Sequence, residues 1–362
     1  MVKKIYLLIC VSLIAISFSL AQQKTNNADT TRLHPLGGIA NKPNSLDIHF
    51  NGFAFLDDHE YDALIPLRKT ISGTRTAIDI GYNLDSLNHF IVGTNAIHEF
   101  GAKPYFLKVN PVAYYSYTSK HLLFNAGEFP RRDLLTQYPR ALLNDTLIYY
   151  RPNVEGLLLR NQNKNGYETG WIDWISRQTP TDRNQFMAGE LGTFIPKPGH
   201  PFYIVHYFLF EHNAGSKSDT TASIQDSGGG QIRFGFDFSH KTIFDSLKFE
   251  AGGMFTEHRL RSFYGFKLSR GFVASVYMSY KHFSIFDEFY RGDPNYLAFA
   301  DPFYTKHIYN RLDFIYTAFL GKHLKGQFIL GLHQSPARLT DSQPGFKVVY
   351  EIGRKILATF SD

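Results

Sequence analysis

Residues 231–238 read Gln-Ile-Arg-Phe-Gly-Phe-Asp-Phe, and this stretch decides the fold. Successive side chains of an extended strand point to opposite faces, so the stretch would form a strand with two unlike sides. The apolar side would carry Ile232, Phe234, Phe236 and Phe238. The polar side would carry Gln231, Arg233, Gly235 and Asp237. Such a strand suits the wall of a β-barrel in a lipid bilayer, where one side meets lipid and the other faces a polar interior.

The same alternation recurs from Ser45 almost to the end of the chain. It predicts an all-β protein, a transmembrane antiparallel β-barrel of about 14–16 strands, each near the ~9–11 residues that a tilted spanning strand needs. A soluble β-sandwich would also alternate, so the period alone does not exclude it. The apolar faces favour the membrane barrel, because they are rich in Phe, Tyr and Leu and place tyrosines near strand ends, as at a membrane interface. No blade-length repeat marks a propeller.

Residues 1–21 have the three parts of a secretory signal peptide. Lys3 and Lys4 precede an apolar run, and small residues at the −3 and −1 positions predict cleavage after Ala21. The alternative is an uncleaved anchor, but the run is short for a spanning helix, which needs ~20 residues. Cys10 is the only cysteine and leaves with the signal, so the mature chain has no disulfide framework. We expect a flexible segment over residues 22–44 and the barrel over residues 45–362.

The amino-acid composition argues against a nucleic-acid partner. Aromatic residues make up 16% of the chain, which fits aromatic strand faces better than a nucleic-acid surface. The formal net charge of +6 falls to +4 once Lys3 and Lys4 are removed, too small a surplus to argue for nucleic acid. No second run of about 18 apolar residues follows the signal, so we expect no transmembrane helix.

Three long connections stand out from the short turns. The segment at 128–152 is long and contains Pro130 followed by Arg131 and Arg132. Residues 212–229 are rich in Ser, Thr, Asp and Gly and predict a mobile surface loop. Residues 284–306 mix aromatic and acidic side chains. The carboxylates of this segment could ligate calcium, but their spacing does not match a calcium-binding loop signature such as the EF-hand. We favour a loop that folds into the lumen and narrows it, because a long loop rich in aromatic side chains is expected to pack against another part of the protein.

These features resemble the outer-membrane β-barrel proteins of Bacteroidetes-type Gram-negative bacteria, in a porin-like form. The resemblance rests on the signal peptide, the alternating aromatic strands through residues 348–352, and the strand at 171–174 after the turn at Asn165 and Gly166. It implies an outer-membrane location, with lipid around the barrel and a polar lumen inside it. The pattern defines an architecture rather than one activity.

Charged residues on the polar strand faces are the candidate lumen lining. They are Lys108, Arg233, Asp237, Lys248, Glu250, Lys281, Arg311, Asp313, Lys325, Lys347 and Glu351, with Asp79, Glu190 and Lys267 on the same grounds. Two hypotheses fit this mixed set. One is a water-filled pore with a mild anion preference. The other is a closed interior that ion pairs hold together.

Two motifs raise other functions. His333 and Ser335 share one strand face, as a base and a nucleophile would in an outer-membrane phospholipase, but alternation places both inside the barrel or at its rim. A strand-end histidine is the simpler interpretation. Trp171 and Trp174 flank Asp173 and could stack a sugar ring, although interfacial belts use tryptophan routinely. We favour the belt.

The sequence therefore predicts a porin-like channel for passive or selective passage of small solutes. The partners expected are outer-membrane lipid, small hydrophilic solutes and envelope proteins, without nucleic acid. We expect no catalytic residue, no cofactor, no metal and no enzymatic activity. The alternatives are a non-conducting barrel that serves as a structural subunit or anchor, and, least favoured, a phospholipase-like enzyme.

Overall fold

The computed structural model describes most of the chain beyond its N-terminal segment. The described residues are 42–62, 69–132, 135, 138–144, 146–216, 223–336 and 338–360. The predicted signal peptide, and all but the last residues of the predicted flexible segment, lie outside this part. No helix among the described residues is long and apolar enough to cross a membrane.

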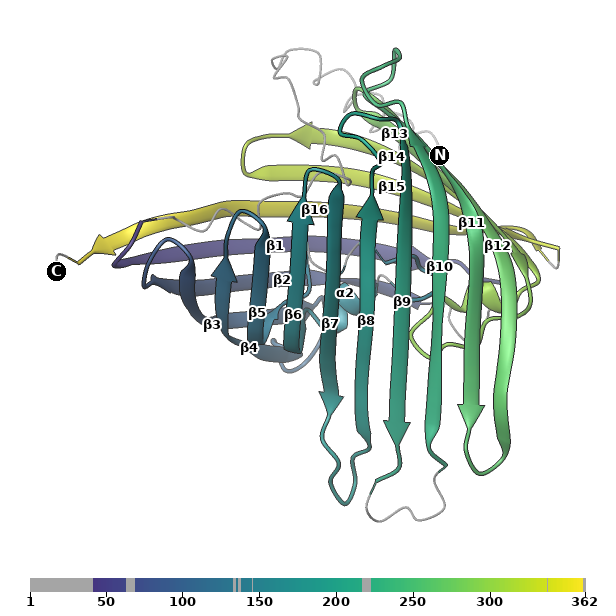
Figure 1. The fold of residues 1–362 in the computed structure, drawn as a ribbon, viewed down its shortest axis with the longest axis horizontal. Helices are drawn as coiled ribbons and strands as arrows, with labels where there is room; N and C mark the ends of the chain where they lie inside the picture. Colours follow the sequence, from purple (N-terminus) through teal and green to yellow (C-terminus); the bar gives the residue numbers. More distant parts are fainter. Residues whose placement is uncertain are drawn as a thin grey trace, which may run out of the picture.

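Sixteen antiparallel strands close into a barrel across the described residues, each paired with its neighbours in sequence and β1 with β16. The predicted all-β barrel of about 14–16 strands is confirmed. The strands are β1 Ser45–His59, β2 Lys69–Asn83, β3 Asn88–Glu99, β4 Lys108–Thr118, β5 Leu122–Pro130, β6 Asn153–Asn163, β7 Gly166–Ser176, β8 Asn184–Phe194, β9 Phe202–Ala214, β10 Gln225–Asp237, β11 Ser246–Leu260, β12 Tyr264–Tyr280, β13 Phe283–Gly292, β14 Ile308–Leu320, β15 Leu324–Ser335 and β16 Arg338–Thr359. In Figure 1, β7–β12 run side by side along one wall, and β1, β2 and β16 pass at a steep angle to them.

The two ends of the barrel differ in their connections. The longest connections, residues 131–152 and 293–307, leave from one end, together with those at 215–224 and 177–183. The start of β1 and the end of β16 lie at the other end, with the short turn at 164–165. Outer-membrane barrels have short periplasmic turns and longer extracellular loops. We therefore assign the end with residues 131–152 as the cell-surface end.

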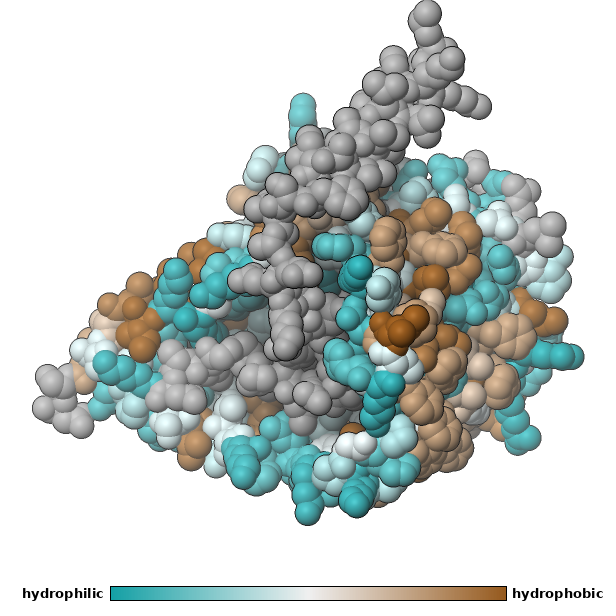
Figure 2. Space-filling view, turned by 90° about the horizontal axis from the view of Figure 1, so that it is seen from above, coloured by the Kyte–Doolittle hydropathy of each residue, from teal (hydrophilic) through white to brown (hydrophobic). Residues whose placement is uncertain are grey.

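The outer wall is apolar where the opening stretch predicts it. Ile232, Phe234 and Phe236 are 45%, 53% and 44% exposed, whereas Arg233 is 4% exposed and faces inward. Phe238 lies just past the end of β10 and stacks on Phe236, with 6.2 Å between ring centroids. Figure 2 shows hydrophobic side chains gathered in broad areas on the flank of the molecule. One face of each strand therefore meets lipid and the other fills the interior.

Two predicted loops are shorter than the sequence indicates. β9 continues to Ala214 and β10 begins at Gln225, so both ends of the predicted loop at 212–229 are strand. Gly228, Gly229 and Gly230 pair with both neighbouring strands, but glycines carry no side chain to reveal the alternation. Likewise, the first part of the predicted loop at 284–306 is β13.

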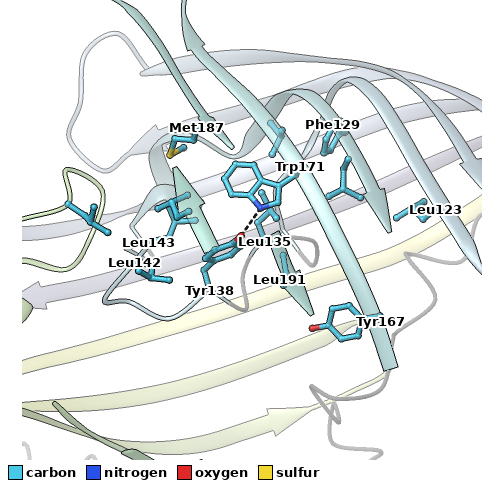
Figure 3. Close-up of a cluster of buried hydrophobic side chains, with 14 residues drawn as sticks. Leu123, Phe129, Leu135, Tyr138, Leu142, Leu143, Tyr167, Trp171, Met187 and Leu191 are labelled. Atoms are coloured by element: carbon cyan, nitrogen blue, oxygen red, sulfur yellow. Dashed lines mark hydrogen bonds between the residues drawn. The ribbon is translucent and has the colours of Figure 1, made fainter. Parts of the chain in front are cut away.

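The described residues of the connection at 131–152 pack inside the barrel beneath the cell-surface end. Tyr138, Leu142 and Leu135 from this segment join Met187 and Trp171 from the inner wall in one buried cluster (Figure 3). The Trp171 indole nitrogen donates a hydrogen bond of 2.8 Å to the Tyr138 hydroxyl. α2, Leu147–Tyr150, is a single turn in this segment. We call residues 131–152 and 293–307 together the plug.

The predicted tryptophan belt is therefore wrong for Trp171, which is 5% exposed and lies in the interior. Trp174 points outward and is 46% exposed, as a belt residue would be. Trp171 and Trp174 lie on opposite faces of β7, as strand alternation requires, but the local sequence does not reveal that an incoming segment gives Trp171 an apolar environment inside the barrel.

Residues 293–307 form the second part of the plug and include the 3₁₀ helix η3, Pro302–Thr305. The Asp301 backbone N–H donates to the Arg140 carbonyl at 2.8 Å, and the Asn295 amide donates to the Ala141 carbonyl at 2.5 Å. Phe303 stacks on His333 of the inner wall, with ring centroids 4.3 Å apart. These contacts place the aromatic loop in the lumen, where the sequence predicts a constriction.

Replacing an outward apolar residue with lysine should destabilise the barrel in lipid. Phe314 lies at the middle of β14 and is 41% exposed on the outer wall. We expect Phe314→Lys to lower the free energy of unfolding by about 2–4 kcal/mol, because a charge at the bilayer midplane loses its hydration. Urea unfolding from lipid vesicles measures this. Ile243→Lys, in the connection after β10, is the control and should change the free energy of unfolding little. Equal losses of stability in the two variants would contradict the assignment of the lipid-facing side.

Candidate active site

Charged side chains in the barrel interior pair with one another instead of standing alone. The Arg233 guanidinium lies 2.9 Å from Glu288 and 3.6 Å from Glu250. Arg311 contacts Asp313 at 2.8 Å, and Asp313 also lies 3.4 Å from Arg140 of the plug. Opposite charges on different strands, on the same strand and on the plug therefore neutralise one another inside the barrel.

Most of the other predicted lumen residues on inward positions also have partners. Lys248 lies 3.5 Å from Asp237, and the Lys347 ammonium lies 5.1 Å from the centre of the Phe53 ring. Glu351 bonds to His49, and Asp79 lies 2.8 Å from Arg354. Lys325 is half-buried on the inner face of β15.

Four predicted lumen residues lie elsewhere. Lys281 occupies the turn between β12 and β13, with a φ of 54°, so it is outside the wall. Lys108 is exposed at the cell-surface end of β4, and Lys267 is exposed toward the same end of β12. Glu190 points outward, because Met187 and Leu191 hold the inward positions of β8. Glu190 was misplaced because a carboxylate was not expected on the lipid side.

His333 and Ser335 lie inside the barrel under the plug, as alternation indicates. The His333 ring is 1% exposed and bonds to the Tyr309 hydroxyl at 2.7 Å and to Gln343 at 3.0 Å. Both ring nitrogens are therefore engaged by groups other than Ser335. A site for a lipid has to open toward the bilayer, so this pair does not form one.

A histidine and an aspartate meet on the outer wall near the cell-surface end. His212 of β9 and Asp226 of β10 are directly opposite in the strand register. The His212 Nδ1 lies 2.9 Å from Asp226 Oδ1. Both face outward, because they continue the even-numbered series that carries Phe210 on β9 and Ile232 on β10. The histidine side chain is 17% exposed and the aspartate is 3% exposed.

Two arginines complete this group, which we call the rim site. Arg259 of β11 is directly opposite Asp226, and its guanidinium Nε lies 3.1 Å from the Asp226 carboxylate. Arg261 follows β11 and reaches the same carboxylate at 2.7 Å. The bond to Asp226 raises the pKa of Arg261, so this side chain stays charged. With both guanidinium groups partly exposed, the rim site presents positive charge outward.

Aromatic residues fix the depth of the rim site. On β8 and β9, Phe186 and Phe210 pack 6.0 Å apart, and the Phe186 ring lies 5.1 Å from the His212 ring. Outer-membrane barrels carry aromatic girdles where the apolar band meets the headgroups. His212 is the next outward position of β9 after Phe210 and lies directly opposite Phe186, so His212 and Asp226 are level with this aromatic pair. We therefore expect them at the boundary between the apolar band and the lipid headgroups.

The geometry of the rim site is that of a general base with its orienting group. A carboxylate on Nδ1 fixes the imidazole tautomer and leaves Nε2 to accept a proton. The sequence did not indicate this site, since both residues fall in the stretch 212–229 that predicts a loop. Extending the strand alternation through the glycines would have revealed a histidine and an aspartate on one face.

The calcium hypothesis for residues 284–306 is not supported by the positions of its carboxylates. Asp287 points outward and accepts a bond from Asn310 at 2.9 Å, whereas Glu288 points inward to Arg233. Asp301 caps η3 through the Phe303 N–H at 3.0 Å. Over the described part of the chain, the group whose donor atoms do converge, within 4.8 Å of one another, is Glu168, Glu190 and His206. It lies in the periplasmic half of the outer wall, away from the rim site.

Solved structures with the same fold are porins. The anion-selective porin of Comamonas acidovorans matches with a TM-score of 0.53 and 9% identity, over 85% of this chain and 99% of the porin. Pseudomonas putida OprB gives 0.51 and 9%, over 85% of this chain and 94% of that one. Salmonella typhi OmpF, solved with daunomycin, gives 0.51 and 9%, over 87% and 99%. At these identities the likeness concerns the fold alone. The chain matches no curated protein.

A family model described as lipid A 3'-O-deacylase-type matches residues 39–357. The match covers nearly the whole barrel and supports the predicted outer-membrane location. It also corrects the expectation that the protein is not an enzyme, because the family carries the name of an enzyme. By this match, the chain belongs to the lipid A 3'-O-deacylase-type family of outer-membrane β-barrels.

Proposed function

We propose that this protein is an outer-membrane esterase that hydrolyses an acyl ester of lipid A. The observation that carries the proposal is the His212–Asp226 pair, which lies on the outward face of the wall level with Phe186. The family name supports the class of reaction and substrate. A packed interior also supports it, because the chemistry is then expected on the outer wall.

In the proposed reaction, His212 Nε2 takes a proton from a water molecule, and the hydroxide adds to the carbonyl carbon of the ester. Asp226 stabilises the imidazolium that forms. The tetrahedral intermediate then collapses, the bond from the carbonyl carbon to the sugar oxygen breaks, and the imidazolium returns its proton to that oxygen. The products are a free fatty acid and a sugar hydroxyl. Arg259 and Arg261 would bind anionic groups of the glycolipid and offset the negative charge of the intermediate.

The test is release of fatty acid from purified lipid A in mixed micelles by the full-length protein. We expect release that rises linearly with protein concentration. Phospholipid micelles of the same acyl composition test the choice of substrate, and the proposal expects slower release from them. No release from either lipid would contradict the proposed activity.

The second candidate function is passage of small solutes, which the porin-like fold favours. The plug opposes it, since Phe303 and Leu142 are 1% and 0% exposed inside the barrel. If the barrel conducts, the plug has to move.

Planar bilayer recordings test this second function. We expect the wild-type protein to give few conductance steps, because the paired interior and the plug leave little room for ions. Frequent large steps from the wild-type protein would favour the channel over the esterase as the main activity.

A further inference from the structure

We infer that Glu168, Glu190 and His206 form a binding site for a divalent transition cation of the zinc class on the lipid-facing wall. The residues come from the adjacent strands β7, β8 and β9. His206 Nε2 lies 3.1 Å from a Glu168 oxygen and 3.7 Å from a Glu190 oxygen. This site is separate from the rim site and does not depend on the proposed esterase activity.

The donor atoms have the spacing that a tetrahedral cation requires. Zinc binds nitrogen and oxygen at ~2.0–2.2 Å, so two of its tetrahedral ligands lie about 3.4 Å apart. The separations from His206 Nε2, 3.1 and 3.7 Å, fall on either side of this value. An imidazole with carboxylates suits zinc and its neighbours better than calcium, which prefers oxygen alone.

The position of the group in the wall supplies the second argument. Along β8 and β9 it lies between Phe194, which is 52% exposed, and Phe210, which is 38% exposed, so it is inside the apolar band. Charges on the lipid face of a barrel are costly. A protonated His206 would balance one carboxylate and leave a net negative charge. A divalent cation with a neutral imidazole balances both carboxylates.

Glycines make room for the group. Gly192 lies directly between Glu168 and His206 in the strand register. A Cβ at this position would collide with the Glu168 carboxylate and lie 2.7 Å from His206 Cε1. Gly170 lies opposite Glu190, and a Cβ there would meet nothing within 4 Å. The wall is therefore shaped so that the three side chains converge and one side stays open.

The test is a calorimetric titration of untagged, chelator-treated, full-length protein in detergent micelles with zinc chloride. We expect one zinc ion per chain. His206→Ala and Glu168→Gln should each weaken binding by at least ~10-fold, the loss typical of even a supporting group. Gly192→Ala should weaken it as well, although it removes no ligand.

Glu155→Gln is the matched control, since Glu155 is an outward glutamate on the neighbouring strand β6 and is not part of the group. It should bind zinc as the wild type does. Heat-modifiable migration on a gel checks that each variant is folded. The inference is overturned if the wild type shows no saturable binding, in which case the group is an ion pair only. It is also overturned if folded His206→Ala and Glu168→Gln bind zinc with wild-type affinity.

Discussion

Replacing His212 with alanine is expected to lower the rate of fatty acid release from lipid A by at least ~100-fold, the lower range for losing a general base. Asp226→Asn should also lower it, because the amide no longer holds the imidazole in the tautomer that leaves Nε2 free. The Asp226 carboxylate lies 2.9 Å from His212 Nδ1 and accepts hydrogen bonds from Arg259 and Arg261. Removing its charge therefore also weakens its hold on these two guanidinium groups.

His258→Ala is the matched control for this experiment. His258 is next to Arg259 on β11 but faces the interior, where it bonds to Tyr264 at 2.9 Å. It should keep the wild-type rate. Equal loss of activity in His258→Ala and His212→Ala would show that the substitutions disturb the cell-surface end of the barrel as a whole, rather than a site on its outer face. Wild-type activity in folded His212→Ala would remove the rim site from the mechanism.

Removing Asp173 is expected to destabilise the protein by about 3–5 kcal/mol, because it leaves a buried arginine without its counter-charge. Asp173 is fully buried on the inner face of β7 and pairs with Arg131 at the start of the plug. Arg151 lies 3.8 Å away on the same carboxylate. Burial lowers the pKa of Arg131, and Asp173 opposes that shift, so the pair keeps the guanidinium charged.

Asp173→Ala should therefore lower the urea midpoint and also release the start of the plug, with more frequent conductance steps in planar bilayers. The double variant Arg131→Met with Asp173→Leu is the control. Replacing both partners by apolar residues of similar size is often close to neutral, so it should recover most of the stability. A single variant as stable as the wild type would show that the pair does not hold the plug.

The sequence predicts the strands of the barrel wall well, but it predicts the packing of the barrel interior poorly. The run from Ile232 to Phe236 has a period of two because each strand separates lipid from the interior, and this local rule extends around the barrel. Which segment fills the interior is a long-range property. Trp171 was predicted as a belt residue because nothing near it in the sequence reveals that Tyr138 packs against it.

The candidate sites were missed for a related reason. No familiar motif spacing links His212 and Asp226, and a Ser- and Thr-rich stretch separates them, so they meet only through strand pairing. Glu190 was assigned to the lumen because polar residues are expected there. Outward polar residues break the alternation rule, and such exceptions are where a function on the lipid side is expected.

The central claim is that the outer wall, at the rim site, removes an acyl chain from lipid A. The most direct measurement is mass spectrometry of lipid A from a Gram-negative host whose outer membrane contains either the wild-type protein or His212→Ala at equal amounts. We predict a lipid A species lighter by one acyl chain with the wild-type protein and its absence with His212→Ala. Unchanged lipid A in both, or the lighter species in both, would contradict the claim.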